Sequence, residues 1–127
     1  MAAVVAATPA LAVAAAPAVP AAAQPAAEVV EIVVIEVSGL LDPIQVDFLA
    51  DALRDAERDG VSALVVRLDS AGSVVPAADV TRLARAIRTS EVPVAAWVGP
   101  GRGAEVQEGA YRLFRAAAVR GMAPGSD

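Results

Sequence analysis

The chain has 127 residues and a formal net charge of −5, and 57% of its residues are hydrophobic, 20% charged and 3% aromatic. Its length suggests one domain with a modest core. The acidic residues are spread along the chain and no basic stripe is present, which argues against nucleic-acid binding. The absence of cysteine excludes a disulfide framework and thiol chemistry.

The set of side chains that could move a proton is small. The sequence contains no histidine, and its ten basic residues are all arginine. Arginine stays protonated in proteins, so it cannot act as a general base. Only carboxylates remain to accept a proton near neutral pH. They show no clustered metal-binding signature, and we expect neither a bound metal nor a cofactor.

Residues 1–27 differ in composition from the rest of the chain. Fifteen of them are alanine and none is charged. Ala21 and Ala23, ahead of Gln24, fit the small-x-small pattern of a signal-peptidase site, so we expect an export signal, although no positive residue precedes the apolar run. A disordered Ala/Pro-rich leader is the alternative. Three prolines by position 20 argue against a retained transmembrane helix. The folded domain is then expected over 28–127.

The first expected unit of that domain is a strand followed by a helix. The run 29–37 is rich in β-branched residues and predicts a strand. Asp42 and Pro43 supply an N-cap and a first-turn proline, and Gly60 closes the helix. The apolar side chains of this helix recur at helical spacing. They are Ile44, Phe48, Leu49, Ala52, Leu53 and Ala56.

Two further units follow. A second strand is expected over 61–68, then a loop over 69–75 and a helix that opens at Pro76. The stripe of that helix is Val80, Leu83, Ala84 and Ile87, and Asp79 is a partner for Arg82. A third strand is expected over 92–98, and after a glycine-rich turn a third helix runs from about 105 to 119. Its expected apolar face is Val106, Ala110, Leu113, Phe114 and Ala117.

Strands that alternate with helices of 10 to 15 residues indicate an α/β fold with a small parallel sheet. The loops at the carboxyl ends of the strands begin at Gly39, Asp69 and Gly99, and a functional site is expected there. Trp97 ends a strand, and we expect it to pack under a helix or at a subunit contact. We expect Tyr111 to lie in the core.

Five loop motifs occur in an order with sensible spacing. They are Ser38-Gly39-Leu40-Leu41-Asp42-Pro43, the LDSAGS run at 68–73, Ser90-Glu91-Val92-Pro93, Val98-Gly99-Pro100 and Met122-Ala123-Pro124-Gly125. Together these motifs resemble the NfeD family of membrane-bound serine proteases of the ClpP class. The resemblance covers residues 29–125. It implies a ClpP/crotonase-like fold of repeated β-α units, with 28–127 as a partial ClpP-like domain.

The resemblance also indicates which residues fall on the oxyanion loop. In the family, the segment after the second strand reads Leu-Asp-Thr/Ser-Pro-Gly-Gly, and its backbone N–H groups help to form the oxyanion hole. Here Gly72 is kept, while Ala71 replaces the proline and Ser73 replaces the second glycine. Serine does not readily adopt the positive φ that glycine permits. We therefore expect an altered oxyanion loop.

The family's nucleophile lies in a Ser-Ala-Gly segment that opens the helix after the third strand. A gapless alignment from Pro100 to Tyr111 puts Gln107 in the position of the serine and Glu108 next to it. An amide is not a nucleophile here. Glu108 adds negative charge beside a site meant to hold an oxyanion, where positive potential is needed.

The family's base is a lysine well downstream of the serine, and this chain ends at Asp127, before that region. The resemblance therefore implies that both halves of the dyad are missing, and loss of the nucleophile alone removes on the order of a million-fold in rate. We expect a degenerate or truncated member without proteolytic activity that keeps peptide binding or self-association. The resemblance further implies an exported or membrane-associated protein, a homo-oligomer, and a stomatin-like membrane protein as partner.

Two other functions fit parts of the sequence. An active ClpP-class peptidase would need Ser70 or Ser73 as a substitute nucleophile, with Asp69, Glu105 or Glu108 as its base. The run from 99 to 104 matches G-x-G-x-x-A and would suit a nucleotide- or CoA-binding module. Turn serines and a flexible turn explain these features more simply. Finally, we expect an unpaired strand edge and uncovered apolar helix faces, and hence self-association or marginal stability.

Overall fold

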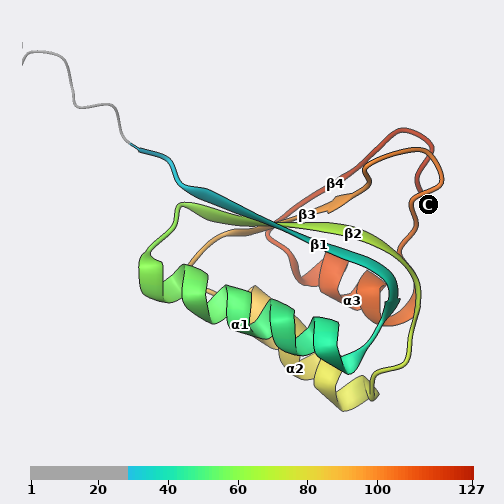
Figure 1. Cartoon of the computed structure of the whole chain (residues 1–127), viewed down its shortest axis with the longest axis horizontal. Coiled ribbons are helices and arrows are strands. Elements are labelled where there is room, and N and C mark those ends of the chain that lie inside the picture. The colour runs from blue at the N-terminus through green and yellow to red at the C-terminus, as the bar shows by residue number, and fades with distance from the viewer. Residues whose placement is uncertain (1–28) are drawn as a thin grey trace, which may run out of the picture.

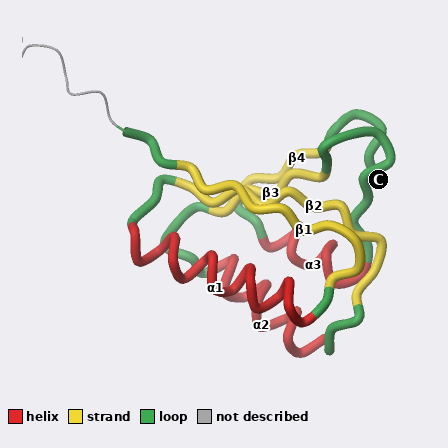
Figure 2. The backbone as a smooth tube through the Cα atoms, viewed as in Figure 1, coloured by secondary structure: helices red, strands yellow, loops and turns green. Residues whose placement is uncertain are grey.

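In the computed structural model, which describes residues 29–127, four strands and three helices alternate along the chain and form two layers (Figure 1). The strands form one sheet in the order β1-β2-β3-β4, and each neighbouring pair is parallel. All three helices lie on the same side of this sheet (Figure 2). The expected α/β fold with a parallel sheet is confirmed. The expected leader, 1–27, lies outside the described residues.

The first unit is β1 (Ile32–Leu41) followed by α1 (Pro43–Asp59). Asp42 accepts a hydrogen bond from the backbone N–H of Gln45 at 2.8 Å, and Gly60 ends the helix in the left-handed conformation with φ 66°. Both expected ends of this helix are therefore confirmed. The strand begins and ends later than the expected 29–37, because its pairing with the next strand continues to Leu41.

The buried face of α1 differs in part from the expected stripe. Ile44 and Phe48 are 78% and 54% exposed, whereas Val46 is buried. Ile44 and Phe48 are four residues apart and share one flank of the helix, which is turned away from the core. The expectation for these two residues was wrong. The buried side chains of α1 are Val46, Leu49, Leu53 and Ala56.

The second unit is β2 (Ala63–Ser73) followed by α2 (Ala77–Arg88). The strand runs five residues past the expected end, so most of the expected 69–75 loop is strand. Contacts with distant segments extend the strand: its last residue, Ser73, pairs with Leu41 of β1, and α3 packs beside it. The buried face of α2 is the expected one, Val80, Leu83, Ala84 and Ile87. The expected ion pair between Arg82 and Asp79 is present at 3.3 Å.

The last unit contains β3 (Val94–Val98), α3 (Glu108–Ala116) and β4 (Val119–Met122). The third helix is shorter at both ends than the expected 105–119. Val106, just before the helix, forms a bridge with Ser70 of β2. After the helix, Ala117 is extended and the chain continues into β4, which pairs with β3. The fourth strand was not expected, because a strand of four residues has too few positions to show a period.

Tyr111 lies elsewhere than expected, and for Trp97 the structure excludes one of the two expected places. Tyr111 is 48% exposed, although its helix neighbour Leu113 is buried as expected. Trp97 lies on the sheet face that faces away from the helices and is 39% exposed. It is therefore not under a helix. Uncovered apolar side chains of the described residues lie both on the helices, as at Ile44 and Phe48, and on the sheet, as at Val34 and Val119.

Candidate functional site

The carboxyl end of β2 and the head of α3 come together at one end of the sheet. Ser70 pairs with Val106 as an isolated parallel bridge. Its N–H donates to the carbonyl oxygen of Glu105 at 2.6 Å, and its carbonyl oxygen accepts from the N–H of Gln107 at 3.0 Å. This bridge holds the LDSAGS segment beside the first residues of α3. The segments to which the sequence assigned the oxyanion loop and the nucleophile are therefore neighbours.

Glu108 and Ser73 are joined directly at this junction. The backbone N–H of Ser73 donates a hydrogen bond to Oε2 of Glu108 at 3.0 Å. Glu108 has a φ of 51°, which is the left-handed region that a non-glycine residue adopts at a cost. This backbone conformation at the first residue of α3 accompanies the turn of its carboxylate back onto β2. One amide of the oxyanion-loop segment is therefore occupied by a negatively charged group.

Gln107 occupies the N-cap position of α3 and has extended geometry, with φ −132° and ψ 160°. Its side chain does not cap the helix. Instead, Nε2 donates to Oε2 of Glu105 at 2.8 Å, in an exposed pair. The head of α3 thus presents an amide that is engaged with a neighbouring carboxylate, and it presents no hydroxyl.

The serines that were weighed as substitute nucleophiles are engaged with the backbone. Ser70 is fully buried, and its Oγ donates to the carbonyl oxygen of Gly72 at 3.0 Å. The Oγ of Ser73 accepts from the N–H of Val75 at 3.3 Å, as in a serine turn. Asp69, one of the three carboxylates considered as a base, accepts from the N–H of Glu105 at 3.1 Å. These contacts are those of a structural turn.

Gly109 lets the two segments approach closely. A Cβ at this position would lie 2.9 Å from Oγ of Ser73 and 3.1 Å from its Cβ, closer than real side chains pack. The second residue of α3 must therefore be a glycine for the Ser73 backbone to reach the Glu108 carboxylate in this arrangement.

A cavity of about 290 Å³ opens beside this junction. Val75 and Val80 supply apolar wall, and Arg112 from the next turn of α3 supplies a cation. The remaining lining residues are Ser73, Ala77, Glu108 and Gly109. Sequence reasoning missed Val75, Ala77 and Arg112 as site residues. No local signal marks them, because the cavity forms only where α2 and α3 meet the end of β2.

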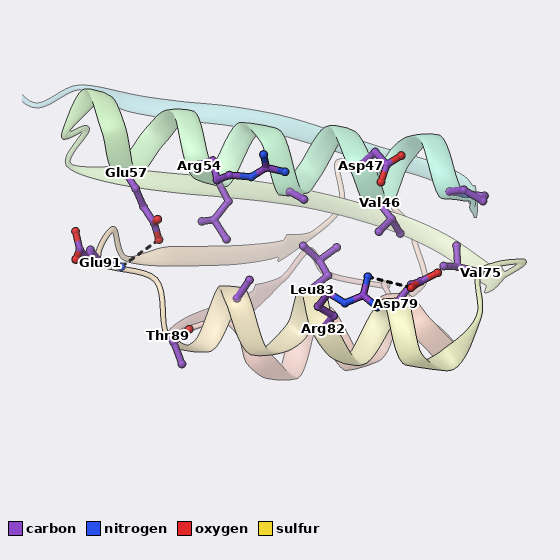
Figure 3. Close-up of a pocket in the computed structure, with 14 residues that line it drawn as sticks. Val46, Asp47, Arg54, Glu57, Val75, Asp79, Arg82, Leu83, Thr89 and Glu91 are labelled. Atoms are coloured by element: carbon purple, nitrogen blue, oxygen red, sulfur yellow. Dashed lines mark hydrogen bonds and ion pairs between the residues drawn. The ribbon is translucent and has the colours of Figure 1, made fainter.

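A larger groove of about 800 Å³ runs between α1 and α2 (Figure 3). Val46, Leu53 and Leu83 are among its apolar lining residues. Two of its charged side chains form an ion pair, Arg82 with Asp79, and the carboxylate of Glu57 accepts a hydrogen bond from the backbone N–H of Glu91 at 3.3 Å. None of the residues that the sequence assigned to a site lines this groove.

The glycine-rich turn after β3 does not have the arrangement of a phosphate loop. The N–H of Gly103 donates to the carbonyl oxygen of Gly125 at 3.0 Å, and the N–H of Ala104 donates to that of Gly101 at 3.3 Å. Helix α3 begins only at Glu108, after a segment that pairs with β2. A dinucleotide loop instead leads directly into a helix whose first N–H groups face the phosphates.

Residues 29–127 contain no cluster of three acidic side chains that could hold a metal ion. Over the same residues, none of the three helices has the length and apolar character needed to cross a bilayer.

Comparison with family models and with curated proteins finds no match. Solved structures do match. The 1510-N membrane-bound stomatin-specific protease, as a lysine-to-alanine mutant in complex with a substrate peptide, aligns with a TM-score of 0.67 at 24% identity, over 75% of this chain and 42% of that one. A serine-to-alanine mutant of the same protease gives the same TM-score and identity over 75% of this chain and 44% of its own.

A third match is the 1510-N membrane protease specific for a stomatin homolog from Pyrococcus horikoshii, with a TM-score of 0.64 at 24% identity, over 75% of this chain and 46% of that one. The chain thus spans less than half the length of each of these proteases. The resemblance to the NfeD-type proteases that the loop motifs indicated is confirmed at the level of the fold. This chain therefore shares the ClpP-like α/β fold of the NfeD-family stomatin-specific membrane proteases.

Proposed function

We propose that this domain is a degenerate relative of the ClpP-like serine endopeptidases, which binds an extended peptide segment at the junction of β2 and α3 and does not cleave it. The observation that carries the proposal is the hydrogen bond from the Ser73 N–H to the Glu108 carboxylate at 3.0 Å. It argues against catalysis and leaves the neighbouring cavity open to a ligand.

The argument against catalysis has two parts. An oxyanion hole stabilises the tetrahedral intermediate with N–H donors that lie about 2.7–3.1 Å from the developing negative oxygen. In this chain the Ser73 N–H is already bonded to a carboxylate, whose charge would repel an oxyanion at the same place. The second part is the attacking atom, because Gln107 at the head of α3 carries an amide. An acyl-enzyme mechanism would lack both its nucleophile and its electrostatic support.

The argument for binding rests on the cavity beside the same residues. Its walls combine the apolar side chains of Val75 and Val80 with the guanidinium of Arg112. Such a mixture suits one apolar side chain of a peptide and a nearby carbonyl or carboxylate group. One structural neighbour is in complex with a substrate peptide, and the neighbours are named as specific for a stomatin homologue. We propose a segment of a stomatin-like membrane protein as the ligand, and with it an exported, membrane-associated location and self-association of the domain.

The inactive part of the proposal is tested with a fluorophosphonate probe, which labels activated serines. We expect no labelling of the folded protein. Labelling at Ser70 or Ser73, located by mass spectrometry, would show a working nucleophile and would overturn the inactive assignment.

The binding part is tested with the substrate peptide of the neighbouring complex, labelled with fluorescein and followed by anisotropy. Ala77 lines the cavity and is exposed, whereas Ala78 is exposed and does not line it. Ala77→Trp should therefore weaken binding at least tenfold, while Ala78→Trp should leave it unchanged. Equal affinity of the two variants would rule out this cavity as the peptide site. Absence of binding by the unaltered protein would rule out the proposed ligand.

A further inference from the structure

The backbone N–H of Ser73 is a donor on the edge of β2 that faces α3. Along a strand, successive N–H groups point to alternate edges, and the next one, of Val74, donates to the carbonyl oxygen of Leu41 in β1 at 2.9 Å. The Ser73 N–H therefore points away from β1. Three residues earlier, the same edge of β2 is closed by the backbone bridge between Ser70 and Val106. At Ser73 it is closed by a side chain instead.

That side chain shows which chemical group this donor takes. Oε2 of Glu108 accepts the Ser73 N–H at 3.0 Å and lies over Gly72, where a Cβ would be 3.7 Å from it. The backbone of Glu108 has a φ of 51°, a strained conformation of the kind that concentrates at binding sites. A carboxylate that belongs to the chain itself is thus held on an amide beside the cavity.

Arg112 carries the positive charge that a carboxylate ligand needs. It lines the same cavity as Glu108 and follows it by one turn of α3. A glutamate and an arginine four residues apart on a helix ordinarily attract each other. Here the Glu108 carboxylate is turned to Ser73, and Arg112 forms no ion pair with any residue of 29–127. Its guanidinium is left for the two-bond contact that arginine makes with a carboxylate.

The rest of the cavity fits the group next to that carboxylate. Its apolar wall is made by Val75, Ala77 and Val80. At about 290 Å³ the cavity has room for one aliphatic side chain with a carboxylate beside it. A peptide offers such a carboxylate in two places, at its C-terminal end or on an acidic side chain.

We propose that the junction of β2 and α3 is a carboxylate-binding site, with the Ser73 N–H and Arg112 as its donors, and that Glu108 is its built-in competitor. The proposal rests on the peptide-binding function proposed above and names the group that the peptide must carry. The ligand carboxylate and the Glu108 carboxylate take the same donor, so a ligand must displace Glu108. Removal of the Glu108 side chain therefore opens the site.

The test compares three forms of the neighbour's substrate peptide by isothermal titration calorimetry. The first has a free C-terminal carboxylate, the second a C-terminal amide, and the third also has amides in place of its acidic side chains. The unaltered chain should distinguish the forms by less than about threefold, because Glu108 occupies the Ser73 N–H. Glu108→Ala should bind a carboxylate form at least about tenfold more tightly than the third form. A preference for the first form over the second assigns the C-terminal carboxylate to the site, and a preference for the second over the third assigns a side-chain carboxylate.

Each donor has its own readout in the Glu108→Ala background. Adding Arg112→Ala should abolish the preference, whereas adding Arg115→Ala should keep it, because Arg115 is exposed on the same helix and does not line the cavity. The amide resonance of Ser73 in a proton–nitrogen correlation spectrum should move downfield when a carboxylate form binds. Circular dichroism establishes that each variant is folded, and Glu108→Gly replaces Glu108→Ala if the latter does not fold.

Equal affinity of folded Glu108→Ala for all three forms would overturn this inference and leave the peptide-binding function standing. A preference that survives Arg112→Ala, or a Ser73 resonance that does not move, would overturn it as well, since the carboxylate would then lie elsewhere. A full tenfold preference in the unaltered chain would contradict the role of Glu108 as competitor. If neither the unaltered chain nor Glu108→Ala binds any form, the peptide-binding function fails, and this inference fails with it.

Discussion

At the head of α3, the backbone conformation of Glu108 destabilises the fold, whereas the hydrogen bond to its side chain stabilises it. The residue has a φ of 51°, where a side chain costs roughly 1–2 kcal/mol relative to glycine. Its carboxylate accepts the Ser73 N–H, and a hydrogen bond to a charged group stabilises by about 1.5–3 kcal/mol when buried and by less at an exposed position such as this one. The two contributions are of similar size, so the conformation persists although it is strained.

Two substitutions at Glu108 separate these contributions. Glu108→Ala removes the carboxylate and keeps the strain, so we expect it to lower the free energy of unfolding by about 1–2 kcal/mol. Glu108→Gly removes both, so it should be more stable than Glu108→Ala by about 1 kcal/mol. Urea denaturation of the two variants measures the difference. A glycine variant less stable than the alanine variant would mean that position 108 is not held in the left-handed region.

At the scale of the elements, the close approach of β2 and α3 defines the site. Gly109 of α3 lies against Ser73 of β2, whereas a Cβ at Gly101 in the turn after β3 would meet nothing within 4 Å. Gly109→Ala should therefore lower the free energy of unfolding by about 1–3 kcal/mol, because the two segments must separate. Gly101→Ala, as the matched control, should change it by less than about 0.5 kcal/mol. Equal effects in thermal denaturation would contradict the packing described for this junction.

Those elements whose ends are marked by local chemistry could be predicted from the sequence. Asp42 and Gly60 fix the ends of α1 through a side-chain cap and a left-handed C-cap, and both act within one turn of chain. The end of β2 and the start of α3 carry no such marker. They depend on the Ser70–Val106 bridge, which joins segments far apart in sequence. For the same reason the third helix was predicted too long. The strand β4 was not predicted because its four residues are too few to show a period.

Part of the candidate site could likewise be predicted from the sequence, and part could not. Sequence reasoning singled out Gly72, Ser73, Gln107 and Glu108, and the structure brings their segments together. It did not predict that the Glu108 carboxylate bonds to the Ser73 N–H, because that contact requires both the extended end of β2 and the left-handed first residue of α3. It left two places open for Trp97, under a helix or at a subunit contact, because the alternation of side chains along a strand does not show which face the helices cover.

At the scale of the whole molecule, the cavity proposed to bind a peptide lies on the helix side of the sheet. The fold is that of the ClpP-like proteases, and the matched region is less than half of each solved neighbour. A shared fold does not by itself imply a shared activity, which depends on the side chains at the site. In the function proposed above, the amide of Gln107 and the carboxylate of Glu108 stand where the reaction needs a hydroxyl and free N–H donors.

The most direct test of that claim is to incubate the folded chain with the neighbour's substrate peptide and follow the peptide by mass spectrometry. The same experiment is made with Gln107→Ser, which introduces a hydroxyl at the head of α3 but leaves the Ser73 N–H bonded to Glu108. We predict that the peptide stays intact with both proteins. Cleavage by the unaltered chain, at one position and above the rate of a heat-denatured sample, would contradict the account.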